Sequence, residues 1–338
     1  MSVIQTPLTE LFGIQHPVLL AGMNVAAGPK LAAAVSNAGG LGVIGGIGYT
    51  PKHLRGVIQD LKKDLKSPDL PFGVDLLIPQ VGGSARKTNY DYTKGKLDEL
   101  IDIIIEEGAK LFVCAVGVPP KHVVERLHKH NILVMNMIGA VKHVKKALAV
   151  GVDIICAQGG EGGGHTGSTP FSILIPNVVD ACKGHVSPLT GKPIYVVAAG
   201  GIFDGRGLAA SLMYGAQAVW VGTRFVASVE AGAPPKHKEL VVTADYGDTG
   251  TTLIYTGRPL RVRRTDYVKS WEKRQDEIEK LTTAGKLPHE QELSKHPELS
   301  LPGRPCVKPA REIIEDMVSG AKQCLLRGDS LIASKGKL

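Results

Sequence analysis

The sequence predicts an α/β protein, a (β/α)8 TIM barrel with a smaller, mainly helical substrate or lid domain inserted after the eighth strand. First, short apolar, β-branched runs alternate with amphipathic segments between residues 17 and 223, which indicates repeated βα units. Second, eight such runs suit a barrel of about 250 residues. Third, the 41 glycines gather in clusters where these runs end. An open parallel sheet is the alternative, because one sequence does not give strand order.

Each strand is predicted from an apolar run that is bounded by glycine or polar residues. In order, these runs are residues 18–21, 41–45, 72–77, 111–115, 133–137, 153–157, 194–198 and 218–222. Because parallel strands of a barrel end on one face, the glycine clusters that follow them are expected to meet there.

The helices are predicted from the amphipathic segments between the strands. They are residues 29–38, 51–63, 96–107, 120–130, 141–150, 171–182 and 205–214. Pro29, Pro51 and Pro120 stand at helix starts, where the first turn tolerates a missing N–H group. Glycines such as Gly39 and Gly108 follow helix ends, as left-handed caps do.

Two tracts are longer than ordinary connections. Residues 78–95 follow the third strand and carry Gly82 and Gly83, which is typical of a long functional loop. Residues 225–320 hold two further helical patterns, at 266–282 and 290–296, among loops rich in glycine and proline.

The position of these tracts predicts the domain organisation. A final helix over residues 309–326 is expected to return to the barrel and close it. We therefore predict a barrel formed by residues 1–224 plus 309–338. Residues 225–308 are predicted to form a smaller, mainly helical domain over the barrel mouth.

Composition excludes several classes of protein. Hydrophobic residues make up 43% and charged residues 21%, a balance that excludes disorder and coiled coil. No run approaches the ~18 apolar residues of a membrane span, and residues 1–10 lack a secretory profile. We expect a cytoplasmic protein. The end Ser334–Leu338 resembles a peroxisomal tripeptide signal, but Gly336 replaces its serine.

Charge favours a small anionic ligand over nucleic acid. The net charge is +8, and residues 258–274 form the densest basic stretch. No aromatic-interleaved strand motif or zinc spacing accompanies it, so no nucleic-acid partner is expected. The motifs H-E-x-x-H, Walker A and G-x-S-x-G are absent from the sequence, and no metal site is predicted. Four histidines on lysine-rich helical segments are expected to be solvated, namely His122, His128, His130 and His143.

The cysteines are predicted to be reduced and structural. There are five, an odd number, and none form a C-x-x-C pair. Cys114 and Cys156 lie inside apolar runs, where buried free thiols are common.

The strongest functional signal is the loop over residues 159–167, which follows the sixth strand. It is mostly glycine and presents one histidine, His165. A planar or phosphorylated ligand that contacts the backbone explains such a loop, and His165 has the ordinary pKa of a group that exchanges protons with substrate. A mobile surface loop is the alternative.

The second signal is the pair of glycine-containing loops after the seventh and eighth strands. They contain Gly200 and Gly201, then Gly222 and Thr223. In many barrels these two loops bind a phosphate group through backbone N–H groups. A G-x-G-x-x-G pattern occurs at residues 40–45 and 162–167, but neither has the strand-before, helix-after context of a dinucleotide site.

Together these motifs resemble one family. The opening segment over residues 6–17, the Ala21-Gly22-Met23 turn, the loop around His165 and the two phosphate loops resemble the FMN-dependent nitronate monooxygenases, formerly called 2-nitropropane dioxygenases. The resemblance spans the chain from residue 8 to about 225 by motif and continues by general layout.

The resemblance implies an FMN site and a catalytic base. His165 matches the base that the family places near the flavin. The implied FMN contacts are Ala21, Gly22, Met23, Asp75, Gln158, Gly163, Gly200, Gly201, Gly222 and Thr223, of which the last four would hold the phosphate.

The implied activity is oxidation of alkyl nitronates, or of nitroalkanes, by O2 to a carbonyl compound and nitrite, with one-electron transfer to FMN. His165 would remove the α-proton of a neutral nitroalkane, or when protonated assist an anionic nitronate. One alternative is an NAD(P)H-dependent FMN reductase of enoyl thioesters or quinones, which Met137 disfavours because some reductases carry lysine there. The non-enzymatic alternative is a flavin-free binding or scaffold barrel. The sequence gives no oligomeric state.

Overall fold

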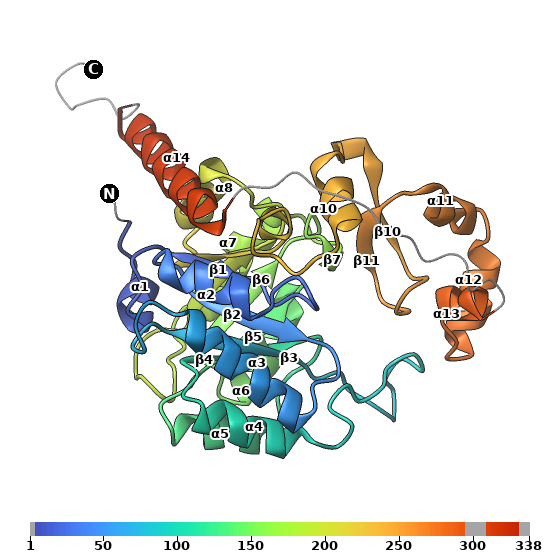
Figure 1. Ribbon diagram of the computed structural model, residues 1–338, viewed down its shortest axis with the longest axis horizontal. Helices are drawn as coiled ribbons and strands as arrows, with labels where there is room; N and C mark the ends of the chain where they lie inside the picture. The colour runs from blue at the N-terminus through green and yellow to red at the C-terminus, as the bar shows by residue number, and fades with distance from the viewer. Residues whose placement is uncertain (1–3, 295–308, 331–338) are drawn as a thin grey trace.

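The computed structural model describes residues 4–294 and 309–330 and has a parallel β-barrel at its centre (Figure 1). The barrel strands are β1 (Val18–Leu20), β2 (Gly42–Gly46), β3 (Phe72–Leu77), β4 (Leu111–Ala115), β5 (Leu133–Ile138), β6 (Ile154–Gln158), β8 (Tyr195–Ala199) and β9 (Ala218–Val221). They pair in the order β1-β9-β8-β6-β5-β4-β3-β2. Backbone N–H groups of Leu20 and Leu41 join β1 to the start of β2 at 2.9 and 3.0 Å, so the sheet nearly closes. The predicted TIM barrel is confirmed.

Side chains point alternately into the barrel and toward the helices along each strand, so they form two separate cores. On β4, Leu111 and Val113 belong to the cluster that fills the barrel, whereas Phe112 and Cys114 pack with the surrounding helices. Helix α1 (Pro7–Phe12), which the sequence analysis did not predict, adds Phe12 to the inner cluster just before β1. The amino-terminal end of the barrel is therefore filled with side chains.

The helices around the barrel lie close to their predicted positions. They are α2 (Pro29–Asn37), α3 (Pro51–Asp64), α4 (Leu97–Glu106), α5 (Lys121–His128), α6 (Val144–Ala149) after a 3-10 turn η1 (Val141–His143), α7 (Phe171–Cys182) and α8 (Gly205–Met213). The Thr50 hydroxyl accepts a hydrogen bond from the N–H group of His53 and caps α3. Pro120 is the cap of α5 and not its first helical residue.

The last helix, α14 (Ala310–Ser330), runs four residues past its predicted end and packs on α8 and α2 (Figure 1). Its approach to α8 is close: a Cβ atom added at Gly205 would lie 2.2 Å from the backbone N of Ala321. Cys306 and the carboxyl-terminal residues 334–338 lie outside the described residues.

The segment between the barrel and α14 differs from the prediction. We call residues 225–294 the insert. The insert begins within α9 (Thr223–Val226). Its further elements are α10 (Pro235–Val242), η2 (Tyr246–Asp248), β10 (Thr249–Thr252), β11 (Leu260–Arg263), α11 (Asp266–Glu272), α12 (Gln275–Thr283) and α13 (Pro288–Leu293). The hairpin β10–β11 was not predicted, and the helix expected over 266–282 is two helices. A small core around Trp271 and Ile254 holds the insert together.

Candidate functional site

The predicted cofactor residues gather at the carboxyl ends of the barrel strands, which in Figure 1 face the insert. Ala21 and Gly22 follow β1, Asp75 lies in β3 and Gln158 ends β6. The loops after β8 and β9 bring Gly200 and Gly222 to the same end. Residues predicted from separate motifs thus share one face of the barrel.

Gly22 and Asp75 lie in direct contact. A Cβ atom at residue 22 would stand 2.3 Å from Oδ2 of Asp75, so only glycine fits there. The Asp75 side chain is 3% exposed, and its Oδ1 has no hydrogen-bond partner among the described residues. Burial raises the pKa of Asp75 to about 7. A buried oxygen without a partner at the mouth of a barrel makes Asp75 a candidate ligand contact.

The loop over residues 159–167, which we call the glycine loop, also meets the carboxyl ends of β8 and β9. A Cβ atom at Gly163 would lie 2.7 Å from the Thr223 hydroxyl oxygen, and one at Gly222 would lie 3.6 Å from the sulfur of Met23. Gly200 has a left-handed φ of 97°, and a Cβ atom there would lie 2.7 Å from the carbonyl oxygen of Gly159. The backbone of these glycines therefore lies close to neighbouring side chains at Gly163 and Gly222, and to another backbone segment at Gly200.

His165 lies in the two-residue strand β7 (Gly164–His165), where it pairs with Leu260 of β11. The Gln158 side chain donates a hydrogen bond of 2.6 Å to the carbonyl oxygen of His165. The imidazole Nε2 lies 2.9 Å from the hydroxyl of Thr256 in the insert. The histidine is thus held between the barrel and the insert.

The imidazole is neutral at pH 7. Burial, followed by the positive charge of Arg258, lowers the pKa of His165 to about 4. Of the two roles that the resemblance implies for His165, this pKa favours the neutral base over the protonated imidazole, and Arg258 adds a positive charge nearby.

Arg258 is a site residue that the sequence analysis did not assign. Its guanidinium donates hydrogen bonds to the Tyr92 hydroxyl at 2.7 Å and to Oδ1 of Asn89 at 3.1 Å. Both partners belong to the long loop after β3, so Arg258 joins that loop to the insert. The only sequence signals were the length of this loop and the basic stretch that begins at residue 258.

Two strained residues stand at the same end of the barrel. Val25, after β1, has φ of 63° and Val116, directly after β4, has φ of 74°. A β-branched residue in the left-handed region is strained, and such strain concentrates at functional sites.

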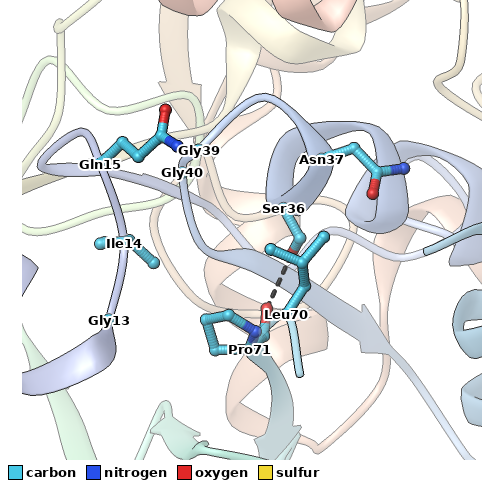
Figure 2. Close-up of a pocket in the computed structure, with 9 residues that line it drawn as sticks. All are labelled: Gly13, Ile14, Gln15, Ser36, Asn37, Gly39, Gly40, Leu70 and Pro71. Carbon is cyan, nitrogen blue, oxygen red and sulfur yellow. Dashed lines mark hydrogen bonds between the residues drawn. The ribbon is translucent and has the colours of Figure 1, made fainter. Parts of the chain in front are cut away.

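Other features do not belong to this site. The small cavity in Figure 2, of about 80 Å³, lies beside residues that precede β1, β2 and β3, at the opposite end of the barrel. Ligand pockets are typically about 300–1,000 Å³, so it is too small for a cofactor. Within residues 4–294 and 309–330, no cluster of metal-binding side chains occurs.

One histidine prediction was wrong. His128 is not solvated, since its Nε2 lies 2.9 Å from Oδ2 of the buried Asp153 and its side chain is 14% exposed. Asp153 also accepts hydrogen bonds from Ser187 and Val134, so this cluster holds the start of β6. The four cysteines that the structure describes are free, and Cys114 and Cys156 are buried.

The sequence matches the family described as nitronate monooxygenase over residues 5–323. The chain belongs to the nitronate monooxygenase family. This assignment makes the protein an oxidoreductase, and it confirms the resemblance carried by the loop around His165 and the loops after β8 and β9.

The proteins that this chain resembles are named for different activities. The chain is 32% identical to a probable nitronate monooxygenase of Staphylococcus saprophyticus, covering 81% of this chain and 83% of that one. It is 39% identical to a (3aS,4S,5R,7aS)-5-hydroxy-7a-methyl-1-oxo-octahydro-1H-indene-4-carboxyl-CoA dehydrogenase of Mycobacterium tuberculosis. This match covers 80% of this chain and 69% of that one.

Solved structures agree on the fold of this family member. FabK from Thermotoga maritima superimposes with a TM-score of 0.79 at 30% identity, covering 97% of this chain and all of that one. Nitroalkane oxidase from Streptomyces ansochromogenes superimposes with a TM-score of 0.77 at 24% identity, covering 95% of this chain and 99% of that one, which is a likeness of fold alone.

Among the described residues of the chain, no helix has the length and apolar character needed to cross a membrane.

Proposed function

We propose that the protein binds FMN at the carboxyl end of the barrel and oxidises alkyl nitronates with O2 to a carbonyl compound and nitrite. The observation that carries the proposal is the half-buried, neutral imidazole of His165, within the field of the buried cation of Arg258, at the rim of a barrel end lined by glycine. Family membership supports the class of reaction.

The residues at this end fit a flavin mononucleotide. The unpartnered oxygen of Asp75 and the close backbone at Gly22 suit a flat ring that contacts the main chain. Ala21, Met23, Gln158 and Gly163 would surround the same ring. The backbone N–H groups of Gly200, Gly201, Gly222 and Thr223 would hold the phosphate, as loops after the last two barrel strands commonly do.

Bound FMN would supply an electron acceptor that O2 reoxidises. The chain itself handles the proton. The Thr256 hydroxyl has one hydrogen, which its 3.4 Å contact with the Arg258 carbonyl uses, so we assign the imidazole as donor from Nε2. The lone pair on Nδ1 is then available to accept the α-proton of a neutral nitroalkane. A nitronate has already lost this proton and needs only the positive surroundings of Arg258.

The first prediction concerns reduction without oxygen. Purified protein is expected to be yellow with FMN, and anaerobic mixing with a nitronate is expected to bleach the flavin absorbance rapidly. NADH or NADPH alone is expected to leave it unchanged over the same time. Colourless protein that cannot be reconstituted with FMN would remove the proposal and favour a flavin-free scaffold.

The second candidate is a flavin enzyme acting on thioesters with NAD(P)H. The 39% identity to a carboxyl-CoA dehydrogenase favours the thioester part of this candidate, because it exceeds the 32% identity to the Staphylococcus nitronate monooxygenase. Met137 at the end of β5, where some reductases carry lysine, is the feature that argues against it. Rapid bleaching by NADH or NADPH, with none by nitronate, would select this candidate.

A substitution at Gly200 tests whether the loop after β8 holds the FMN phosphate. Gly200→Ala is expected to lose FMN on gel filtration, because the new Cβ atom would meet backbone atoms of Gly159 at 2.7–2.9 Å. Gly184→Ala is the matched control, since φ there is 78° but open space surrounds the position. It carries the left-handed strain without the collision, so it should keep FMN. Retention of FMN by both variants would show that the loop after β8 does not hold the phosphate.

A further inference from the structure

Arg258 is a buried cation with neutral partners only. Its residue is 8% exposed, and its Nε has no hydrogen-bond partner in the described part of the chain. The partners of its two terminal nitrogens are the amide of Asn89 and the hydroxyl of Tyr92, with the Tyr92 ring centre 5.7 Å away. No carboxylate within residues 4–294 or 309–330 forms an ion pair with it.

Three other arginines of the insert do have a counter-ion. Arg263, Arg264 and Arg274 are more exposed, and each has a carboxylate partner at 2.6–3.3 Å. Burying a charge costs several kcal/mol unless an opposite charge or strong hydrogen bonds offset the lost hydration. Arg261 also has no carboxylate partner among the described residues, but it is only half-buried, and it donates to the carbonyl oxygen of Gly160 and to the Thr249 hydroxyl. Arg258 is thus the deeply buried guanidinium of the insert, and no described carboxylate offsets its charge, which indicates that a ligand provides the counter-ion.

The backbone that carries Arg258 is fixed beside the proposed base. The Thr256 hydroxyl contacts both the imidazole of His165 and the carbonyl oxygen of Arg258. On the other side, Arg86 donates a hydrogen bond of 2.9 Å to the carbonyl oxygen of Gly257. The segment over residues 256–258 is therefore anchored to both the glycine loop and the long loop after β3, and the cation is held in place before any anion arrives.

We propose that Arg258 is the anion-binding, specificity-determining residue of this site, and that it selects substrates whose reacting end is a planar group with two negatively charged oxygens. The unpartnered Nε lies on the guanidinium edge, and arginine binds such groups through parallel hydrogen bonds. This inference rests on the proposed function and deepens it. Nitronates and carboxylates share the required shape and charge, so a carboxylate is a non-reacting probe of the same site.

The test compares propionate with its neutral analogue propionamide by isothermal titration calorimetry on the FMN-loaded protein. Propionate is expected to bind competitively with nitronate, and propionamide about 10- to 100-fold more weakly, as expected for loss of a charge-assisted hydrogen bond. Arg258→Met is expected to weaken propionate binding by a similar factor and leave propionamide unchanged. Arg258→Lys keeps the charge and should restore part of the affinity. The matched control is Arg264→Met, on an arginine paired with Glu272 away from the site.

Two further measurements separate binding from folding. Tyr92→Phe removes a neutral partner and leaves the guanidinium, so it should bind propionate within about threefold of wild type, since one neutral hydrogen bond contributes little. In Arg258→Met the pKa of His165, followed by NMR of the ring proton, is expected to rise, because the charge that lowers it is gone. A variant that merely misfolded would weaken propionamide binding too.

Equal binding of propionate by wild type and Arg258→Met, or equal binding of propionate and propionamide by the wild type, would overturn the proposal. Its failure is distinguishable from failure of the proposed function. Propionate binding that depends on Arg258, in a protein that oxidises no nitronate, keeps the anion site and removes the activity. Nitronate oxidation with unchanged kcat/KM in Arg258→Met keeps the activity and removes the anion site.

Discussion

His165→Ala is expected to lower kcat/KM for a neutral nitroalkane by about 10²–10⁴-fold, the usual contribution of a positioned general base. The physical reason is that a carbon acid releases its α-proton slowly to water, and His165 is a neutral, half-buried nitrogen base at this end of the barrel. The loss on a preformed nitronate is expected to be much smaller, because that proton has already been removed. Initial rates of O2 consumption with nitroalkane and with nitronate, on FMN-loaded protein, give the comparison.

The pH dependence supplies an independent check of the same role. Since the pKa of His165 is lowered to about 4, the base is unprotonated throughout the neutral range. His165 is therefore expected to add no inflection to the nitroalkane rate near the ordinary histidine value of about 6.5, and an inflection near pH 7 would belong to Asp75 and persist in His165→Ala. In Arg258→Met the pKa of His165 is expected to be higher, so the inflection that His165 causes should move from about pH 4 toward higher pH. Unchanged rates of His165→Ala on both substrates would mean that another group takes the proton.

The barrel was predictable because its signals are local and repeated. Each inner strand is a short apolar run, and the alternation seen on β4, with Leu111 inward and Phe112 outward, lies within one run. The hairpin β10–β11 was not predictable in this way. Its strands are four residues long and read Thr-Gly-Thr-Thr and Leu-Arg-Val-Arg, and β11 is completed by pairing with His165, about 95 positions earlier.

The site residues likewise divide into those that local sequence signals predict and those that only the folded chain brings together. Glycine clusters and a histidine after barrel strands pointed to the correct end of the molecule, because parallel strands bring their carboxyl ends together. Thr256 and Arg258 lack any motif, and they meet His165 only through the folding of the insert. The sequence also does not reveal that burial leaves the imidazole neutral, since a pKa depends on neighbours that are distant along the chain.

Asp75→Asn is expected to stabilise the flavin-free protein at pH 8 by up to about 4 kcal/mol, with no gain at pH 4. The value follows because burial raises the pKa of Asp75 from 3.8 to about 7, and each tenfold change in an ionisation constant is worth about 1.4 kcal/mol. Between pH 4 and 7 the folded protein keeps a proton on Asp75 that the unfolded chain has released. Rising pH therefore favours unfolding, and above pH 7 the folded state must hold a buried, unpaired carboxylate.

The free energy of unfolding in urea, measured at pH 4 and pH 8, tests this difference, and Asp153→Asn is its matched control. Asp153 is equally buried but its carboxylate is fully engaged, with Ser187 Oγ at 2.6 Å, the N–H group of Val134 at 2.7 Å and His128 at 2.9 Å. Asparagine there loses charge-assisted hydrogen bonds, so that variant should be less stable. If Asp75→Asn also destabilised the protein at pH 8, the Asp75 carboxylate would have a partner at the barrel mouth, and the ligand-facing role of its free oxygen would be lost. A gain at pH 8 alone means that the fold keeps a costly carboxyl group there, as expected of a residue placed for a ligand and not for stability.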